Sequence, residues 1–202
     1  MQLSASASLI LTTLEARDPS PPLAPTSSWR PDLASELNEA ADDDMLDGAV
    51  ANPWMARAVR SGLLLWNDAL DPAHTLAMSD DVDDDLSRQT LDYWHGIMHR
   101  REPDYPNAKY WFRRVGDHPT FPAVLTAAKV AVDAAGSPAG DPARQLVAAA
   151  EHWDSSAFID LCEAHETSET QTNELLRAIQ VAEIGVLLDF SAGHAVGAAV
   201  ER

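Results

Sequence analysis

Apolar residues recur at helical spacing along most of this chain, and this periodicity constrains the fold more than any other feature. Toward the C-terminus, Leu175, Ile179, Ala182 and Val186 follow one another at intervals of three or four residues. An α-helix places residues at such intervals on one face. Alternation of apolar and polar residues, the pattern of a half-buried strand, is rare after residue 15. The sequence therefore predicts an all-α fold, a single helical-bundle-like domain of six to eight helices.

Proline separates the N-terminal region from this domain. Residues 18–31, DPSPPLAPTSSWRP, contain five prolines and cannot form a helix. Residues 1–14 are apolar and tolerate a strand conformation. We therefore expect residues 1–31 to form an extended arm and proline-rich linker, anchored by Trp29, that wraps its own domain or docks on a neighbouring subunit. The helical domain is predicted at 32–202, with a core centred on helices at 54–70, 86–101, 121–135 and 170–190.

The charge balance narrows the classes of partner. The 202 residues include 32 acidic and 14 basic side chains, for a formal net charge of -18. Such an acidic protein repels phosphate backbones, so nucleic-acid binding is not expected. No apolar run reaches the roughly 18 residues of a membrane span, and the N-terminus lacks the early positive charge of a signal peptide. We expect a cytoplasmic protein without a membrane partner.

Residues 93–119, YWHGIMHRREPDYPNAKYWFRRVGDHP, differ from the rest of the chain in composition. They hold three of the seven histidines, five of the fourteen basic residues and two of the six tryptophans. Alanine, leucine, valine and aspartate dominate elsewhere. This contrast favours a binding or catalytic site, and it leaves open whether the protein is an enzyme.

A metal site is one interpretation of this stretch. His95, His99 and Glu102 lie at positions i, i+4 and i+7 of the helix predicted at 86–101, and such positions fall within about 60° of one another around a helix. Two imidazoles one turn apart, with a carboxylate on the next turn, can bind a divalent metal such as zinc. His74 or His118 can supply a further ligand. In catalysis, His95 or His99 would serve as metal ligand or general base.

A metal-free site for a small polar or anionic ligand is the second interpretation. Guanidinium groups bind carboxylates and phosphates in bidentate fashion, and aromatic rings can stack on a sugar or another ring. The ligand-binding residues expected on these grounds are Arg100, Arg101, Asn107, Tyr110, Trp111, Arg113, Arg114 and His118. If the protein is an enzyme, hydrolysis or isomerisation of a polar substrate fits best.

Two alternatives need no small-molecule site. Arginines that flank a turn can pair with nearby acids, and histidines can be core residues held by the same acids. In a non-enzymatic interaction or assembly protein, the Arg/Trp stretch and the N-terminal arm would form an interface, for example in a homo-oligomer. We favour a site, because buried ion pairs stabilise a fold less than apolar packing does. A purely structural role would make poor use of so many charged side chains.

The motif HRREPD, followed by NAKYWFRR and GDHP, resembles a family of uncharacterised bacterial proteins. The upstream run GLLLWNDALDPAHTLAM and the downstream run HWDSSAFIDLCE fit the same pattern, so the resemblance covers roughly residues 55–190. It implies no particular activity, cofactor or partner. It does imply that one group of motif residues acts together, namely His74, His95, His99, Glu102, Asn107, Tyr110, Arg113 and His118.

Overall fold

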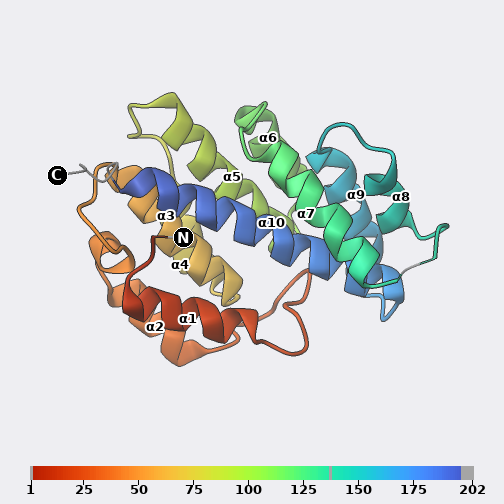
Figure 1. Ribbon diagram of the computed structural model, residues 1–202, viewed down its shortest axis with the longest axis horizontal. Helices are drawn as coiled ribbons and strands as arrows, with labels where there is room; N and C mark the ends of the chain where they lie inside the picture. The colour runs from red at the N-terminus through yellow and green to blue at the C-terminus, as the bar shows by residue number, and fades with distance from the viewer. Residues whose placement is uncertain (1, 137, 197–202) are drawn as a thin grey trace.

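The computed structural model describes residues 2–136 and 138–196, and over these ranges the chain is helical (Figure 1). It forms α1 (Ala5–Glu15), α2 (Pro31–Glu39), the 3-10 helix η1 (Asp42–Met45), α3 (Pro53–Trp66), α4 (Leu70–Ala77), α5 (Asp85–Arg101), α6 (Tyr105–Val115), α7 (Phe121–Ala134), α8 (Pro142–Ala148), α9 (Ser155–His165) and α10 (Gln171–Ala195). The all-α prediction is confirmed. None of these described helices has both the length and the apolar character to cross a membrane.

The number of helices differs from the prediction. Ten α-helices lie within the described ranges, against the six to eight expected. Part of the excess is α1, because residues 5–15 are helical rather than extended. Residues 137 and 197–202 of the predicted helical domain lie outside the described residues.

Polar side chains and prolines determine where the helices begin. A side-chain oxygen accepts a backbone N–H in the first turn of seven helices, from the capping residues Ser4, Asn52, Asp84, Asp104, Asp141, Asp154 and Thr170. Proline opens α2, α3 and α8, where its missing N–H would have had no intrahelical partner. Several of the chain's many aspartates therefore act as helix caps, and their negative charge suits the positive end of the helix dipole.

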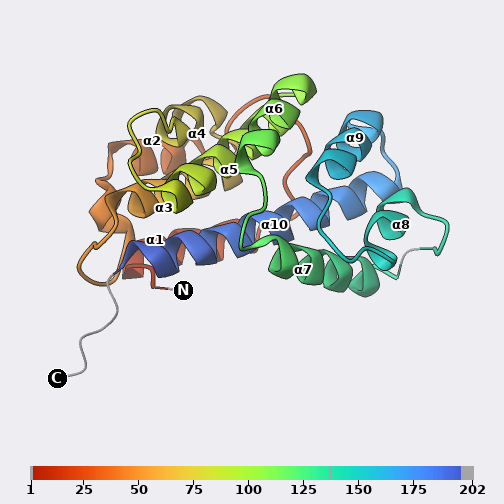
Figure 2. The ribbon, with the colours of Figure 1, turned by 90° about the horizontal axis from the view of Figure 1, so that it is seen from above.

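The longest helix, α10, runs along the molecule (Figures 1 and 2). α3 and α7 pack against α10, and α8 and α9 also contact it. α5 lies on α3 and is flanked by α4 and α6. The four helices expected to form the core, α3, α5, α7 and α10, all bury apolar side chains.

Two glycines permit close contacts on either side of α5. A Cβ atom at Gly62 of α3 would lie 2.7 Å from the ring of Trp94, and one at Gly96 of α5 would lie 2.8 Å from the ring of Phe112 in α6. Real Cβ atoms need more room, so a larger residue at either position would push the helices apart. Gly96 thus lets α6 lie close beside the part of α5 that carries His95.

The N-terminal region packs on its own chain, so the prediction of an extended arm is wrong for residues 5–15. The buried side chains of α1 are Ala7, Ile10, Leu11 and Leu14, which have the spacing of one helix face. The residue before the helix is also held, because the Ser4 N–H donates to the Met45 carbonyl over 3.0 Å. The helical spacing of these apolar residues outweighs their tolerance of a strand.

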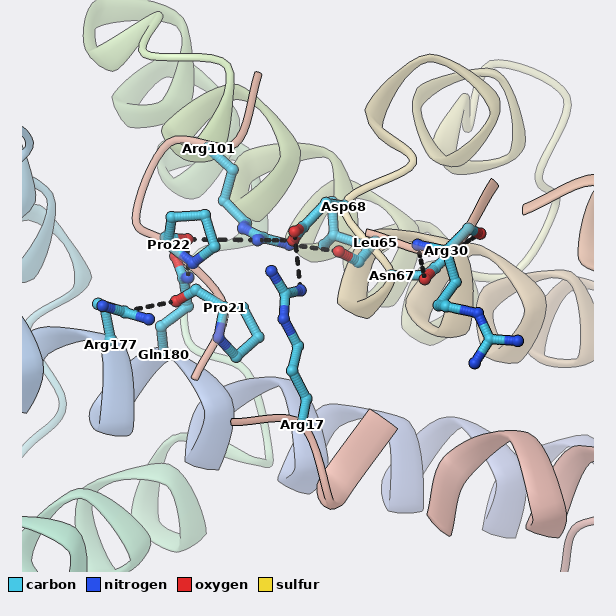
Figure 3. A network of polar contacts seen from close by, with 10 residues as sticks. All are labelled: Arg17, Pro21, Pro22, Arg30, Leu65, Asn67, Asp68, Arg101, Arg177 and Gln180. Atoms are coloured by element: carbon cyan, nitrogen blue, oxygen red, sulfur yellow. Dashed lines mark hydrogen bonds and ion pairs between the residues drawn. The ribbon is translucent and has the colours of Figure 1, made fainter. Parts of the chain in front are cut away.

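The proline-rich segment is irregular between residues 18 and 30, as predicted, and a buried ion-pair network lies beside it (Figure 3). Asp68 pairs with two guanidinium groups, that of Arg17 at 2.7 Å and that of Arg101. Arg101 donates further to the carbonyl oxygens of Leu65 and Pro22. A buried carboxylate is costly unless it is paired in this way.

Further contacts hold the same segment against α10 and the end of α3. Arg177 and Gln180 of α10 donate to the Pro21 and Pro22 carbonyls over 2.9 and 3.2 Å. Trp29 is an anchor, as expected: its backbone N–H donates to the carbonyl of Asn67, at the end of α3, over 3.0 Å. The segment therefore wraps the domain of its own chain (Figure 3).

Candidate metal centre

Three histidine rings converge between α4 and α5. His74 lies in the last turn of α4, and His95 and His99 occupy successive turns of α5. Their ring centroids are 4.6 Å apart for His74 and His95, 5.3 Å for His74 and His99, and 4.9 Å for His95 and His99. One potential ligand atom from each ring lies within 4.8 Å of those of the other two. The structure therefore brings His95 and His99 together with His74, one of the two histidines expected as a further ligand.

His95 and His99 point into the protein, as their apolar neighbours on α5 indicate. Leu91 and Met98, which share this side of the helix, are buried. His95 and His99 are only 3% and 6% exposed. His74 is half-buried, so it is the most exposed of the three rings.

α6 supplies the opposite wall of the cluster. The indole of Trp111 lies flat against the His95 ring, with centroids 3.7 Å apart and planes inclined by 16°. The Arg114 guanidinium lies over the same Trp111 ring, 4.6 Å from its centroid. The stacking on His95 and the contact with Arg114 restrict rotation of the indole, and the indole in turn restricts rotation of the His95 imidazole.

His99 is oriented by two polar side chains. Its Nδ1 lies 3.1 Å from the Glu102 carboxylate, and its Nε2 lies 3.1 Å from the amide nitrogen of Asn107. A carboxylate only accepts, so Nδ1 carries the proton and Nε2 presents a lone pair. The lone pair accepts from Asn107 in this structure. A metal ion at Nε2 would replace that hydrogen bond, while Glu102 would continue to hold the ring.

The cluster favours neutral imidazoles. Burial, followed by the neighbouring His74 and His99, lowers the pKa of His95 to about 3. Burial and His74 also lower the pKa of His99, against an opposing effect from Glu102. Neutral imidazole is the form that binds metals. Moreover, the Nδ1 atom of His95 is buried and has no hydrogen-bond partner among the described residues, an arrangement that costs about 1–3 kcal/mol.

The donor set fits a transition-metal ion. A tetrahedral zinc ion with Zn–N bonds of about 2.0–2.1 Å holds its ligand nitrogens about 3.4 Å apart. The nitrogens here lie within 4.8 Å of one another, so binding of an ion would require the rings to move closer together. Three imidazoles without thiolates suit zinc, copper, nickel or iron. Glu102, the fourth predicted ligand, caps α5 and contacts His99, which places it behind a ligand rather than among the three.

Arg100 and Arg101 are not part of this cluster. They are 1% and 0% exposed, and carboxylates occupy both. Arg100 donates to Glu183 of α10 over 2.6 Å, and Arg101 pairs with Asp68. Both arginines, which were expected to bind a ligand, form buried ion pairs instead of facing the histidines.

The remaining basic residues of the stretch are divided between two sides of α6. Arg114 pairs with Asp92 over 3.0 Å and covers Trp111. Arg113 is exposed and, two residues beyond Trp111, points away from the cluster, since two residues turn a helix by about 200°. Tyr110 is 46% exposed and touches the edge of the Trp111 ring. Arg113 is therefore not positioned to clamp a ligand held by the histidines.

His118 lies in a separate buried site. Its Nε2 is 3.1 Å from the Thr90 hydroxyl, and its Nδ1 is 2.8 Å from the Thr120 hydroxyl. Tyr93 and Phe190 pack edge-on against its ring. Both ring nitrogens are thus occupied, so the structure does not bring His118 together with the residues of the motif that surround His95 and His99.

The acids that pair with the arginines lie outside the sequence motif that carries the histidines. Glu183 is 0% exposed, and it accepts from the Tyr93 hydroxyl over 2.9 Å as well as from Arg100. Asp92 is also buried and accepts from Ser79 over 2.5 Å. The sequence held one indication of Glu183, which is an isolated acid in the apolar run QVAEIGVLL. A charged side chain that is buried among apolar residues requires a partner.

Comparison with family models, curated proteins and solved structures gave no match. The resemblance to a bacterial family remains a prediction, and it assigns no activity. The case for function therefore rests on the geometry around the three histidines.

Proposed function

We propose that this protein binds a divalent transition-metal ion, such as zinc, through His74, His95 and His99, and that the ion holds a small polar ligand at its open coordination position. The observation that carries the proposal is the convergence of three imidazoles whose potential ligand atoms lie within 4.8 Å of one another. The buried Nδ1 of His95, which has no partner among the described residues, supports it, because buried polar atoms are normally satisfied.

The chemistry of such an ion follows from its ligand count. Three protein ligands leave one position of a tetrahedral zinc ion for water or substrate, as in catalytic rather than structural sites. The ion lowers the pKa of a bound water to about 7 and polarises a bound oxygen. Hydrolysis of a polar substrate is the reaction that we propose first, and isomerisation the second. Binding without turnover would use the same contacts.

Outer contacts support the same assignment. Metal-bound histidines usually donate their second ring N–H to a carboxylate or carbonyl, which fixes the ring and strengthens the ligand. Glu102 is placed to do this for His99 at 3.1 Å. Stacking by Trp111 restrains His95. Two of the three proposed ligands are therefore held in place before an ion arrives.

The two metal-free alternatives have less support. Arg100, Arg101 and Arg114 already pair with carboxylates, which leaves little basic surface at the cluster for an anion. Assembly through an extended N-terminal arm has lost its motivating observation, because α1 and the proline-rich segment pack on their own chain. We therefore pursue the metal site.

Elemental analysis tests the proposal. Protein incubated with zinc and freed of excess ion should retain about one zinc per chain, the stoichiometry of a single three-histidine site. His95→Ala and His99→Ala should reduce the zinc content to background, with circular dichroism confirming that each variant folds. His152→Ala is the matched control, because His152 is exposed and lies outside the cluster. Absence of bound zinc from the unmodified protein, or equal retention by all variants, would remove the proposal.

A further inference from the structure

Two of the three proposed ligands are oriented by side chains outside the cluster, and the third is not. Glu102 contacts His99, and Trp111 stacks on His95. The aromatic contacts of His74 are with the other two histidines, and its ring makes no hydrogen bond within the described ranges. Its position therefore depends on where α4, the helix that carries it, lies against α5.

A buried carboxylate on α5 joins α4 to α6 beside the histidines. Asp92 is 2% exposed, and it lies three residues before His95, on the neighbouring turn of the same helix face. Its Oδ1 accepts from the Ser79 hydroxyl over 2.5 Å, and its Oδ2 accepts from the Nε of Arg114 over 3.0 Å. Because both oxygens are engaged, Asp92 is not among the potential ligands of the ion.

The Ser79 contact holds the end of α4. Ser79 is buried and follows the last residue of α4 by two positions, and His74 lies in the last turn of that helix. A hydrogen bond from a hydroxyl to a carboxylate is roughly twice as strong as one between neutral groups. A shift of this end of α4 would move His74 relative to the two histidines of α5. Arg57 of α3 also donates to the Met78 carbonyl, so the same turn stays attached when the Ser79 contact is lost.

The Arg114 contact holds the wall on the α6 side. The guanidinium of Arg114 lies 4.6 Å from the Trp111 ring centroid, and the indole lies on His95 at a centroid distance of 3.7 Å. Asp92 fixes the guanidinium through Nε, so the carboxylate acts on His95 through two successive contacts. One buried acid is thus connected to a ligand on α4 and to a ligand on α5.

We infer that Asp92 is a positioning residue of the proposed metal centre, which holds His74 through the end of α4 and His95 through Arg114 and Trp111. The inference rests on the proposed metal centre and extends it to the contacts that set the spacing of the three rings. Residues that support metal ligands typically contribute about 10–100-fold to metal affinity. Substitution of Asp92 itself would also change the charge near the ion, so its two contacts are tested separately.

Ser79→Ala tests the α4 contact without a change of charge. We expect zinc affinity, measured by competition with a chromogenic chelator, to fall about tenfold. The matched control is Ser87→Ala, because Ser87 is 0% exposed and its hydroxyl accepts from Asn52 over 2.9 Å. Both variants lose a buried hydrogen bond and should unfold at a lower urea concentration, but only Ser79→Ala should bind zinc more weakly.

Arg114→Lys tests the α6 contact and keeps the positive charge. Lysine has no planar group to lie over the indole, so zinc affinity should again fall about tenfold. Arg88→Lys is the matched control. Arg88 is similarly exposed and pairs with Asp85 over 2.7 Å, and neither residue belongs to the histidine cluster.

A spectroscopic measurement separates positioning from loss of stability. Cobalt(II) in place of zinc reports the coordination geometry through its visible absorption. At saturating cobalt, Ser79→Ala should have an altered spectrum, because His74 no longer approaches the ion in the same way. Ser87→Ala should have the spectrum of the unmodified protein.

Failure of this inference can be distinguished from failure of the metal centre. Normal zinc affinity and an unaltered cobalt spectrum in Ser79→Ala and Arg114→Lys, or equal losses in these variants and in their controls, overturn the inference alone. A protein that retains no zinc overturns the proposed metal centre and this inference with it.

Discussion

The indole of Trp111 is stacked on the imidazole of His95 at a centroid distance of 3.7 Å, and this contact joins α6 to the proposed metal centre. His95 is otherwise restrained by burial alone on its Nδ1 side, where that atom has no hydrogen-bond partner among the described residues. The aromatic contact with Trp111 therefore contributes to the orientation of this ligand.

Replacement of Trp111 should weaken metal binding more than it perturbs the fold. Trp111→Ala frees the His95 ring to rotate, so we expect zinc affinity to fall about tenfold, as when other supporting residues around metal ligands are removed. Trp111→Phe retains a flat ring and should bind nearly as well as the unmodified protein. Competition titration with a chromogenic chelator measures both. Equal zinc affinity in the alanine variant would contradict a positioning role for the indole.

Glu102→Gln should lower zinc affinity without unfolding the protein. A glutamine can still contact His99, but it removes the negative charge that fixes the Nδ1–H tautomer, and such changes cost roughly 10–100-fold in metal affinity. The Glu102 side chain is half-exposed, so its loss leaves no unpaired buried charge. Glu151→Gln, at another exposed acid, is the matched control. The chelator titration would count against Glu102 if both variants behaved alike.

Leu14 and Leu9 provide a direct test of where α1 packs. Leu14 is 1% exposed, whereas Leu9 in the same helix is 70% exposed. Leu14→Ala should lower the free energy of unfolding by about 2–4 kcal/mol through lost burial and a residual cavity, and Leu9→Ala by less than about 0.5 kcal/mol. Urea denaturation gives both values. An N-terminal arm detached from the domain would make the two substitutions equivalent.

His118 should make the fold sensitive to mild acid. Burial, and secondarily His194, lowers the pKa of His118 to about 4, whereas an unfolded histidine has a pKa of about 6.5. Between these values the unfolded chain binds a proton that the folded chain does not, so the free energy of unfolding falls as the pH falls from about 6.5 to about 4. The contribution is fully present above this window.

The corresponding measurement compares His118→Gln with the unmodified protein. From pH 7 to pH 4.5, the unmodified protein should lose on the order of 2 kcal/mol more than the variant, because other titrating groups act in both. Urea denaturation at the two pH values yields the difference. Parallel losses in the two proteins would show that His118 does not titrate as its burial requires.

Much of the helical fold was predictable, because it depends on local spacing and capping. The helices at 86–101 and 170–190 followed from periodicity, and Thr170 caps α10. The N-terminal error arose from residue type being weighed above spacing. Ile10 and Leu14 tolerate a strand, but their separation by four residues suits a helix.

The candidate site was predictable only in part. The spacing of His95 and His99 along one helix is a local property, so it was visible in the sequence. The approach of His74 depends on how α4 packs against α5, and the sequence offered it only as one of two candidates. The arginine partners were hidden, because Arg100 and Glu183 are 83 residues apart and Arg101 and Asp68 are 33 apart.

Anomalous diffraction at the zinc edge from crystals grown with zinc tests the central claim most directly. The proposed centre predicts one strong peak about 2.0–2.1 Å from a nitrogen of each of His74, His95 and His99, and its absence from crystals of the His95→Ala variant. A peak bound elsewhere on the acidic surface, or none at all beside these three rings, would contradict it.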